Sequence, residues 1–376
     1  MLGTKMRMQS PKTSSPESGE VKGELYTWGR NQSGQLGNGT NDGVLISTQV
    51  GEENDWSVVS AGELHSLAIR NGEVYSWGTN TGGITGLGLN EDSEVRTPRK
   101  IDRLTSCTHV AAGTRHSLVI SEGKLFAFGG SENYQTGLGV MDTIVVPTQV
   151  GTFEDWELAA TGNHHSIGLR SGRLYAWGSN AYGSTGRGID TGYTIEPIEI
   201  GLGFSDWTYI SAGENTGFAI RSGLLYSWGY NDRGKTGQNI NMGNTLVPTQ
   251  VGVGTEYEHG WTKVSGGKSH VLGLRDGKLY AWGNNVHGRT GLGLGNGNTL
   301  APTQVGEFSD WEDIAAGVSC SLAIRNGELY VWGNNAYGAT GLGRANGYED
   351  MPIRVDSQTG WKSVSVAFHS MAIKEA

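Results

Sequence analysis

The stretch that decides the fold is HSLAIRNGEVYSWG at residues 65–78, because the chain repeats it with small changes. The copies are HSLVISEGKLFAFG from His116, HSIGLRSGRLYAWG from His165, TGFAIRSGLLYSWG from Thr216, HVLGLRDGKLYAWG from His270 and CSLAIRNGELYVWG from Cys320. A seventh copy is divided between the chain ends, with GELYTWG at Gly23–Gly29 and HSMAI at His369–Ile373. A repeat of about 50 residues therefore sets the architecture.

Each copy predicts a β-hairpin. Val, Ile, Leu and Tyr alternate with small or polar residues in both arms, which is the period-two pattern of a half-buried strand. A two-residue turn such as Asn71-Gly72 or Asp276-Gly277 separates the arms. These pairs favour a type I′ turn, which needs positive φ at both central residues.

The tryptophans lie in two columns of the repeat. The first column holds Trp28, Trp77, Trp177, Trp228, Trp282 and Trp332, with Phe128 at the seventh place. The second holds Trp56, Trp156, Trp207, Trp261, Trp311 and Trp361, with Cys107 at the seventh place. All 12 tryptophans are thus accounted for, and this regularity predicts core residues that pack one unit on the next.

Each unit contains about four short strands and no helix signal, and four-stranded units repeated around an axis form a β-propeller. The sequence therefore predicts an all-β fold, a seven-bladed β-propeller over residues 23–376. Glu24–Trp28 should pair with Ser370–Ile373 in a blade shared by both ends of the chain. Such closure removes two exposed sheet edges.

Composition limits the partners. The formal net charge of −9 argues against binding DNA through broad phosphate neutralisation, and no apolar run is long enough to span a membrane. We therefore expect no nucleic-acid or membrane partner. The two cysteines, Cys107 and Cys320, do not make a disulfide framework and are expected to be buried free thiols.

Residues 1–22 are rich in Ser, Pro, Lys and Glu and lack periodicity, which predicts a flexible tail or docking arm. Lys5, Arg7 and Lys12 are its candidate partner contacts. The segment has no apolar signal-peptide core, so secretion through a signal peptide is not expected.

The whole repeat resembles that of the regulator of chromosome condensation family. The resemblance rests on W-G-x-N-x-x-G-x-x-G-L-G, then P-x-x-V, A-G-x-x-H-S-L-A-I and G-x-L-Y-x-W-G, and extends from Gly23 to Ile373. It implies a closed ring of seven blades. Family members include a chromatin-bound guanine-nucleotide exchange factor, a plant ultraviolet photoreceptor, modules attached to ubiquitin ligases, and microbial and phage proteins. The loop sequence Ile84-Thr85-Gly86-Leu87-Gly88 is similar to the loop sequences of bacterial and phage members.

Two family functions can be compared with the residues. The exchange factor uses a protruding β-wedge, whereas the one visible insertion here, Val253–Gly260, has only about four extra residues beyond the usual repeat length. The photoreceptor carries Trp in the segment before its blade histidines. The corresponding segments here, such as Gly62-Glu63-Leu64-His65-Ser66, contain none. Both observations argue against a direct transfer of function.

No catalytic constellation stands out. Five of the nine histidines share one column, namely His65, His116, His165, His270 and His369. Equivalent positions in a ring stand one per blade, so we expect these side chains to hydrogen-bond neighbouring backbone rather than to bind a metal. The glycine loops lack the ending of a phosphate-binding loop. We expect no cofactor and no enzymatic activity.

Binding surface remains, and binding residues concentrate in loops that depart from the repeat. Tyr193, Tyr257, His259 and Tyr348 are the candidates there. The leading hypothesis is a non-enzymatic structural or protein-interaction propeller in a larger assembly. Its most concrete form is a virion accessory protein, docked to phage capsid or tail proteins by residues 1–22, and otherwise a cytoplasmic protein. The alternatives are a GTPase regulator and a propeller that binds a carbohydrate or receptor at its rim.

Overall fold

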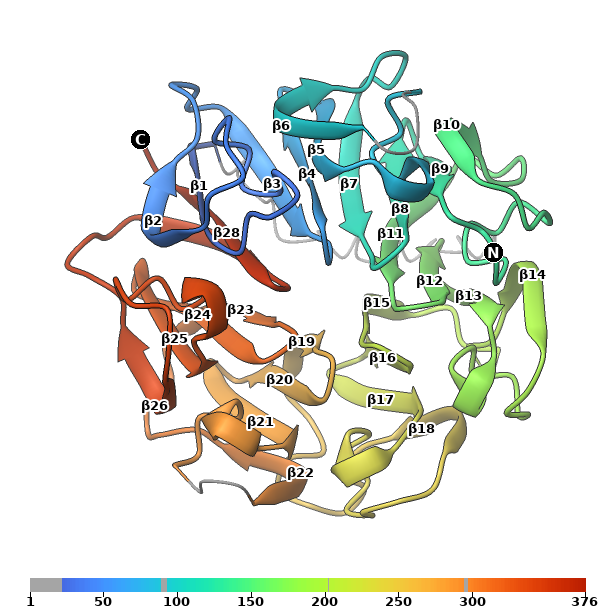
Figure 1. Ribbon diagram of the computed structural model, residues 1–376. Coiled ribbons are helices and arrows are strands. Elements are labelled where there is room, and N and C mark those ends of the chain that lie inside the picture. The colour runs from blue at the N-terminus through green and yellow to red at the C-terminus, as the bar shows by residue number, and fades with distance from the viewer. Residues whose placement is uncertain (1–21, 89–92, 202, 294–296) are drawn as a thin grey trace, which may run out of the picture.

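Seven four-stranded antiparallel sheets stand around a central axis in the computed structural model (Figure 1). The structure describes residues 22–88, 93–201, 203–293 and 297–376. The predicted seven-bladed propeller is confirmed, with the alternating strands of each repeat forming one blade. Lys5, Arg7 and Lys12 lie outside the described residues.

The strands of each blade run outward from the axis in sequence order, except in the blade that closes the ring. Blade 1 contains β3 (Trp56–Ala61), β4 (His65–Arg70), β5 (Glu73–Thr79) and β6 (Glu94–Lys100); blade 2 contains β7 (Cys107–Ala112), β8 (His116–Ser121), β9 (Lys124–Gly129) and β10 (Ile144–Gln149); blade 3 contains β11 (Trp156–Thr161), β12 (His165–Arg170), β13 (Arg173–Ser179) and β14 (Tyr193–Glu199). Blade 4 contains β15 (Trp207–Ala212), β16 (Thr216–Arg221), β17 (Leu224–Gly229) and β18 (Thr245–Gln250); blade 5 contains β19 (Trp261–Gly266), β20 (His270–Arg275), β21 (Lys278–Asn284) and β22 (Asn298–Gln304); blade 6 contains β23 (Trp311–Ala316), β24 (Cys320–Arg325), β25 (Glu328–Asn334) and β26 (Tyr348–Arg354). Blade 7 contains β27 (Trp361–Val366) and β28 (His369–Lys374), followed outward by β1 (Glu24–Gly29) and β2 (Val44–Gln49).

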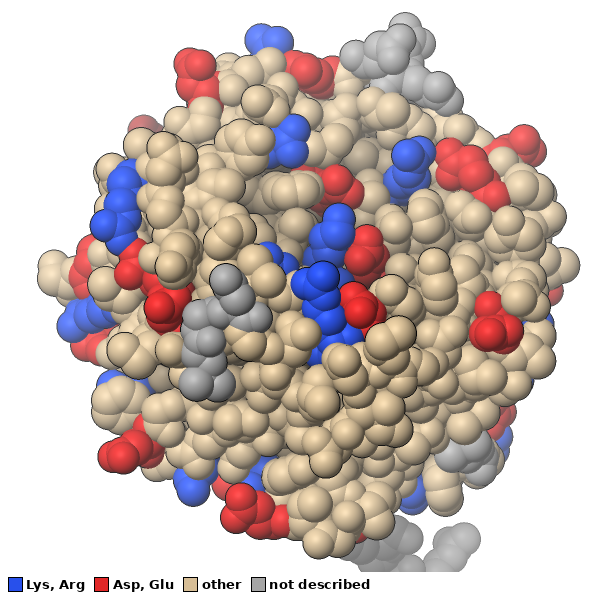
Figure 2. Space-filling view, turned by 60° about the horizontal axis from the view of Figure 1, so that its bottom comes forward, with Lys and Arg blue, Asp and Glu red and all other residues tan. Residues whose placement is uncertain are grey.

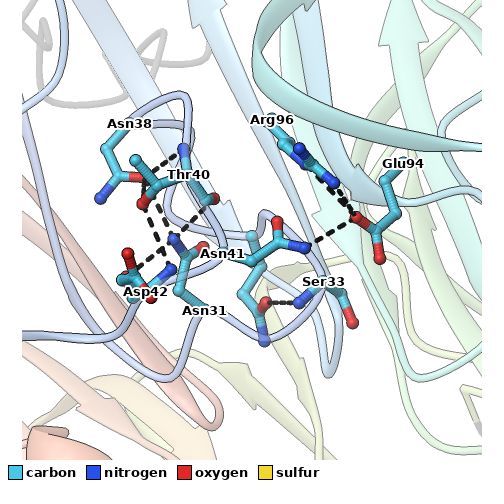
Figure 3. A network of polar contacts seen from close by, with 9 residues as sticks. Asn31, Ser33, Asn38, Thr40, Asn41, Asp42, Glu94 and Arg96 are labelled. Atoms are coloured by element: carbon cyan, nitrogen blue, oxygen red, sulfur yellow. Dashed lines mark hydrogen bonds and ion pairs between the residues drawn. The ribbon is translucent and has the colours of Figure 1, made fainter.

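Blade 7 closes the ring as predicted. β1 pairs antiparallel with β28, and Leu25 lies opposite Ile373 while Trp28 lies opposite Ser370. The loop after β1 also contacts blade 1, because the Asn41 side-chain amide donates to the Glu94 carboxylate at 3.0 Å (Figure 3). The two ends of the chain are therefore joined in one sheet, and the loop after β1 also ties this sheet to blade 1.

The hairpin turns have the predicted geometry. Asn71 and Gly72 have φ of 50° and 73°, and the less typical pair Ser171-Gly172 has 46° and 67°. Both central residues also have positive φ in the other four turns. This is the backbone that a two-residue type I′ turn requires, so sequence and structure agree at all six hairpins.

The hydrophobic core is divided among the seven joints between neighbouring blades. Each joint has its own cluster of buried side chains drawn from two blades. Six clusters contain a tryptophan from each column, as predicted. The joint of blades 1 and 2 has Cys107 and Phe128 at those places. It is the one joint without tryptophan among the described residues.

The two ends of the ring differ. At one end, here called the channel face, lie the loops that join the first to the second and the third to the fourth strand of each blade. At the other, here called the turn face, lie the two-residue turns and the connections between blades. Five single-turn 3-10 helices lie on channel-face loops, at η1 (Thr81–Gly83), η2 (Ala181–Gly183), η3 (Asp232–Gly234), η4 (Val286–Gly288) and η5 (Ala336–Gly338). In the described part of the chain, no helix has the length and apolar character needed to cross a membrane.

Candidate functional site: the channel face

The loops between the first and second strands surround the mouth of the central channel. A cavity of about 190 Å³ lies among them. Small residues such as Gly62 and Gly162 recur at its wall, whereas the next loop position changes from blade to blade. That variable position holds Glu63, Thr114, Asn163, Glu214, Lys268 and Val318, with Phe368 in the shorter loop of blade 7. The repeat thus builds the mouth, and the variable position gives each side of it a different chemistry.

Charged side chains gather at this mouth. Figure 2 shows basic side chains over the middle of the ring with acidic ones beside them. Lys268 lies 3.7 Å from Glu214, and Arg233 lies 3.4 Å from Asp232. These pairs are exposed, so each contributes little to stability. They give the surface neighbouring positive and negative charges, which a partner with the complementary charge pattern can recognise.

A second set of side chains is displayed by strained backbone. Tyr182, Arg233, His287 and Tyr337 occupy the same place in the loops of blades 3 to 6, and each has φ between 57° and 62°. Blade 1 has Gly82 there, with φ of 65°. A bulky residue rarely adopts this conformation, and such strain is concentrated at functional sites. Tyr182 and Tyr337 are about half exposed, so their rings are available to a partner.

Two of the predicted partner-binding residues lie at the channel-face ends of their strands. The Tyr193 ring lies 5.6 Å from that of Tyr134, and the Tyr348 ring lies 5.8 Å from that of His287. Both tyrosines are about half exposed. Aromatic side chains thus line the outer part of the channel face across several blades.

The other two predicted residues lie at the turn face. The insertion that holds Tyr257 and His259 folds onto its own blade, because Trp261 Nε1 donates to the Tyr257 carbonyl at 2.8 Å. Arg275 donates to the His259 carbonyl at 2.6 Å. The insertion therefore lies against blade 5, and the structure does not bring it together with Tyr193 and Tyr348.

Four of the five column histidines hydrogen-bond serine side chains of the next blade, and for these four the expected direct contact with backbone is corrected. His65 Nε2 lies 2.8 Å from Ser117 Oγ, and His369 Nε2 lies 2.6 Å from Ser66 Oγ across the closing joint. Ser66 Oγ donates its proton to the Gln35 carbonyl at 2.8 Å, so it must accept from the imidazole N–H. The serine hydroxyl thus links the imidazole to a backbone carbonyl, and the sequence pattern did not reveal this link.

The same bridge joins blades 2 and 3 and blades 5 and 6. His116 Nε2 lies 2.7 Å from Ser166 Oγ, and His270 Nε2 lies 2.8 Å from Ser321 Oγ. Burial lowers the pKa of His65, His116, His165 and His369 to about 3. These imidazoles are therefore neutral at physiological pH and serve as structural groups.

The bridge is missing on both sides of blade 4. Gly217 and Val271 replace the serine there, and Thr216 replaces the histidine. Beside this gap the buried Lys235 ammonium donates to the Lys268 carbonyl at 2.7 Å. Burial lowers the pKa of Lys235 to about 8. Nothing in the repeat pattern marked this lysine, because Gln35, Ile84 and Gln135 stand at the equivalent places.

The described residues contain no group of three or more His, Cys, Asp or Glu side chains placed to hold a metal ion. Cys107 and Cys320 are buried free thiols, as predicted. Burial raises the pKa of Cys107 to about 11 and that of Cys320 to about 12, so neither is a reactive thiolate. What the channel face offers is a recognition surface of aromatic and charged groups.

Comparison with known proteins shows which family this chain resembles in sequence. The profile of the regulator of chromosome condensation (RCC1) repeat matches residues 22–69, 71–120, 122–169, 222–274 and 276–324. The chain is 30% identical over 299 residues to the ultraviolet-B receptor UVR8 of Arabidopsis thaliana, and this covers 77% of the chain and 66% of UVR8. It is 29% identical over 151 residues to the protein pim1 of Schizosaccharomyces pombe, and this covers 34% of the chain and 28% of pim1.

Among solved structures, Prp20p of Saccharomyces cerevisiae superposes with a TM-score of 0.82 at 24% identity, covering 96% of this chain and 93% of Prp20p. The named relatives are plant and yeast proteins, so the expected likeness to bacterial and phage members is not borne out, and nothing in these comparisons supports a virion component. The five matched repeats and the closed ring of seven blades establish that this chain belongs to the regulator of chromosome condensation (RCC1) repeat family.

Proposed function

We propose that this protein is a non-enzymatic regulator that binds a small GTPase through its channel face. The observation that carries the proposal is the chemistry of that face. Large aromatic and basic side chains are held there at strained positions of successive blades. Tyrosine and arginine are the residues on which protein–protein binding energy concentrates.

The two faces support this choice of surface. The two-residue turns of the turn face are nearly uniform and end in glycine in six blades. On the channel face the equivalent loop positions range from Glu63 to Lys268 and Phe368. A surface that differs at every blade can select one partner and fix its orientation.

The class of partner is taken from the likeness to Prp20p, whose structure was reported with its binding properties to Gsp1p, a GTPase, and histones. Of these two partners, histones would need a dominant acidic surface, whereas the channel face carries both signs of charge. The GTPase is therefore the partner proposed for this face. Among the described residues, the insertion Val253–Gly260 lies against blade 5 at the turn face, so the proposed contact comes from the channel-face loops.

Binding of purified Gsp1p to the intact chain tests the proposal. Nucleotide-free and GDP-bound Gsp1p would be passed over the immobilised chain, with biolayer interferometry as the readout. A regulator of the exchange type binds the nucleotide-free form more tightly, because nucleotide and regulator affinities are linked. We expect at least a tenfold preference, which corresponds to about 1.4 kcal/mol. Equal affinity for both forms would contradict regulation, and no binding would contradict the choice of partner.

Matched variants locate the surface. Tyr182→Gly combined with Tyr337→Gly removes two rings and keeps the backbone, because Gly82 adopts the same φ in blade 1. We expect this channel-face variant to lose at least tenfold in affinity. Arg173→Ala, at the turn-face end of β13, removes an exposed cation that is paired with Glu199 at 3.1 Å and should leave binding unchanged. The reverse order of effects would place the partner on the turn face.

A further inference from the structure

The joint between blades 1 and 2 departs from the other six in several side chains at once. Cys107 replaces the tryptophan that packs on a tyrosine in the other blades, and Phe126 replaces that tyrosine. Ser106 and Ser121 replace the aspartate and arginine that pair at the turn face of blades 1, 3, 4 and 6, as Asp206 and Arg221 do at 2.7 Å. An entire packing unit has therefore been exchanged for smaller groups.

A hollow of about 430 Å³ opens at this joint. It lies between the outer strand of blade 1 and the outer two strands of blade 2. Its wall is apolar where Leu87, Leu104, Phe126 and Pro147 line it. Its volume is in the range of small-molecule sites, which are concave and mostly apolar with a few polar groups for orientation.

The rim of the hollow carries more positive than negative side chains. Arg99, Lys100 and Arg103 lie on it beside a single acid, Asp102. Lys100 is paired with Glu73 at 2.5 Å. Arg99 and Arg103, by contrast, have no ion-pair or hydrogen-bond partner within the described segments and are exposed. The hollow is therefore flanked by two guanidinium groups that are free to pair with a ligand.

Backbone strain supports a function for the same loop. Arg103 has φ of 73° and Ser106 has φ of 49°. Gly203 adopts φ of 78° at the place in blade 3 that corresponds to Arg103. An arginine at a position suited to glycine destabilises the loop locally, and such residues persist mainly where they are needed.

We propose that this hollow binds a small amphipathic organic anion. The apolar body of the ligand, an aromatic or branched group, lies against Leu104, Phe126 and Pro147. Its carboxylate pairs with Arg99 and Arg103, whose planar guanidinium groups match carboxylate geometry. The site lies between the outer strands of blades 1 and 2, and Arg103 lies on the turn-face connection between these blades.

Binding of 2-naphthoate to the full chain, measured by isothermal titration calorimetry, tests this site. We expect one molecule per chain, and at least tenfold weaker binding of the neutral 2-naphthalenemethanol, because the alcohol cannot form the ion pairs. Absence of any heat up to about 1 mM naphthoate, the weak end of specific affinities, would overturn the proposal. Equal affinity for the alcohol would overturn the role of the arginines.

Three variants localise the ligand. Arg99→Gln combined with Arg103→Gly removes both cations and relieves the positive φ, and should weaken naphthoate binding at least tenfold. Phe126→Trp fills the hollow and should weaken naphthoate and the alcohol together. Arg96→Gln, on the same strand but paired with Glu94 at 3.2 Å, is the matched control and should bind as the parent chain does. Unchanged binding in the first two variants, with the fold intact by circular dichroism, would place the ligand elsewhere and refute the site.

Discussion

At the scale of single residues, the buried histidines show how a repeated side chain can join blades without carrying chemistry. Each bridging imidazole donates to a serine of the next blade, which in turn donates to a loop carbonyl. The column was visible in the sequence because it recurs. The serine link was not, since a neighbouring serine in sequence gives no sign that its hydroxyl faces another blade.

Acid should destabilise the protein through these histidines. Their folded-state pKa of about 3 lies below the ordinary 6.5, so the unfolded chain binds protons more tightly. The stabilisation is complete above pH 6.5 and is lost as the pH falls toward 3. Each such histidine should lower the free energy of unfolding by about 2 kcal/mol between pH 7 and pH 5. Urea unfolding at both pH values measures this loss.

Two variants separate titration from hydrogen bonding. His165 faces Gly217 of the next blade in place of a serine, so His165→Thr should change stability little at pH 7 and reduce the loss at pH 5. His116→Thr breaks the bond to Ser166 and should cost about 1 kcal/mol at pH 7. An undiminished pH effect in both variants would mean that other groups cause the acid sensitivity.

Lys235 should be a destabilising residue at neutral pH. Its folded-state pKa of about 8 lies below the ordinary 10.5, so stability increases as the pH rises from 8 toward 10.5, where the unfolded chain also loses the proton. Lys235→Gln, which places the side chain found at Gln35 and Gln135, should raise the free energy of unfolding by about 1 to 3 kcal/mol at pH 7. It should also remove the increase above pH 8. A lower free energy of unfolding at pH 7 in this variant would show that Lys235 is stabilising instead.

At the scale of strands and turns, the sequence predicted what local chemistry decides. The alternation of residues 65–70 gave β4, and the turn pairs gave positive φ at positions such as Asn71 and Ser171. The joints between blades were less predictable. The two tryptophan columns indicated packing, but only the structure distinguishes their roles at Trp177 and Trp156.

Those roles lead to a matched pair of substitutions. Trp177 Nε1 donates to the Gln135 carbonyl at 2.9 Å, whereas Trp156 Nε1 has no partner in the described structure. Trp177→Phe copies the side chain at Phe128 and should cost about 1 to 3 kcal/mol, from lost volume and a lost hydrogen bond. Trp156→Phe should cost about 1 kcal/mol less, because no bond is lost. Chemical denaturation compares the two, and equal losses would exclude the hydrogen bond as a contributor.

At the scale of the whole molecule, closure of the ring joins segments that are more than 300 residues apart. Leu25 lies in the core between blades 7 and 1, and Trp28 lies in the core between blades 6 and 7. Removal of residues 23–29 should therefore open two joints at once and lower the melting temperature of the entire ring. A chain that lacks only residues 1–21 keeps β1 and is the control. A cooperative melt at the parent temperature after the longer deletion would contradict closure as a source of stability.

The features of this molecule that the sequence predicted are those that the repeat determines. Seven copies of one unit determine the ring, the blade order and the pairing of β1 with β28. Residues that occur once have no such support. Nothing in the pattern placed Lys235 in the core or showed that Arg99 and Arg103 lie over a hollow without a partner among the described residues, because burial and pairing there depend on neighbours in another blade.

The same limit applies to the binding surface. Tyr193 and Tyr348 were chosen because their loops break the repeat, and they lie at the channel face, while Tyr257 and His259 lie at the turn face. Sequence departures alone do not distinguish the two ends of a propeller. The strained loop positions at Tyr182 and Tyr337 are recognisable only from backbone angles.

The central claim is that a GTPase binds across the channel face. Hydrogen–deuterium exchange of the intact chain, alone and saturated with nucleotide-free Gsp1p, tests it most directly. We predict slower exchange in the complex at the loops around Glu214, Lys268, Tyr182 and Tyr337, with no change at the turns Asn71-Gly72 and Asn326-Gly327. Protection confined to the turn face, or no protection at saturating Gsp1p, would contradict the account.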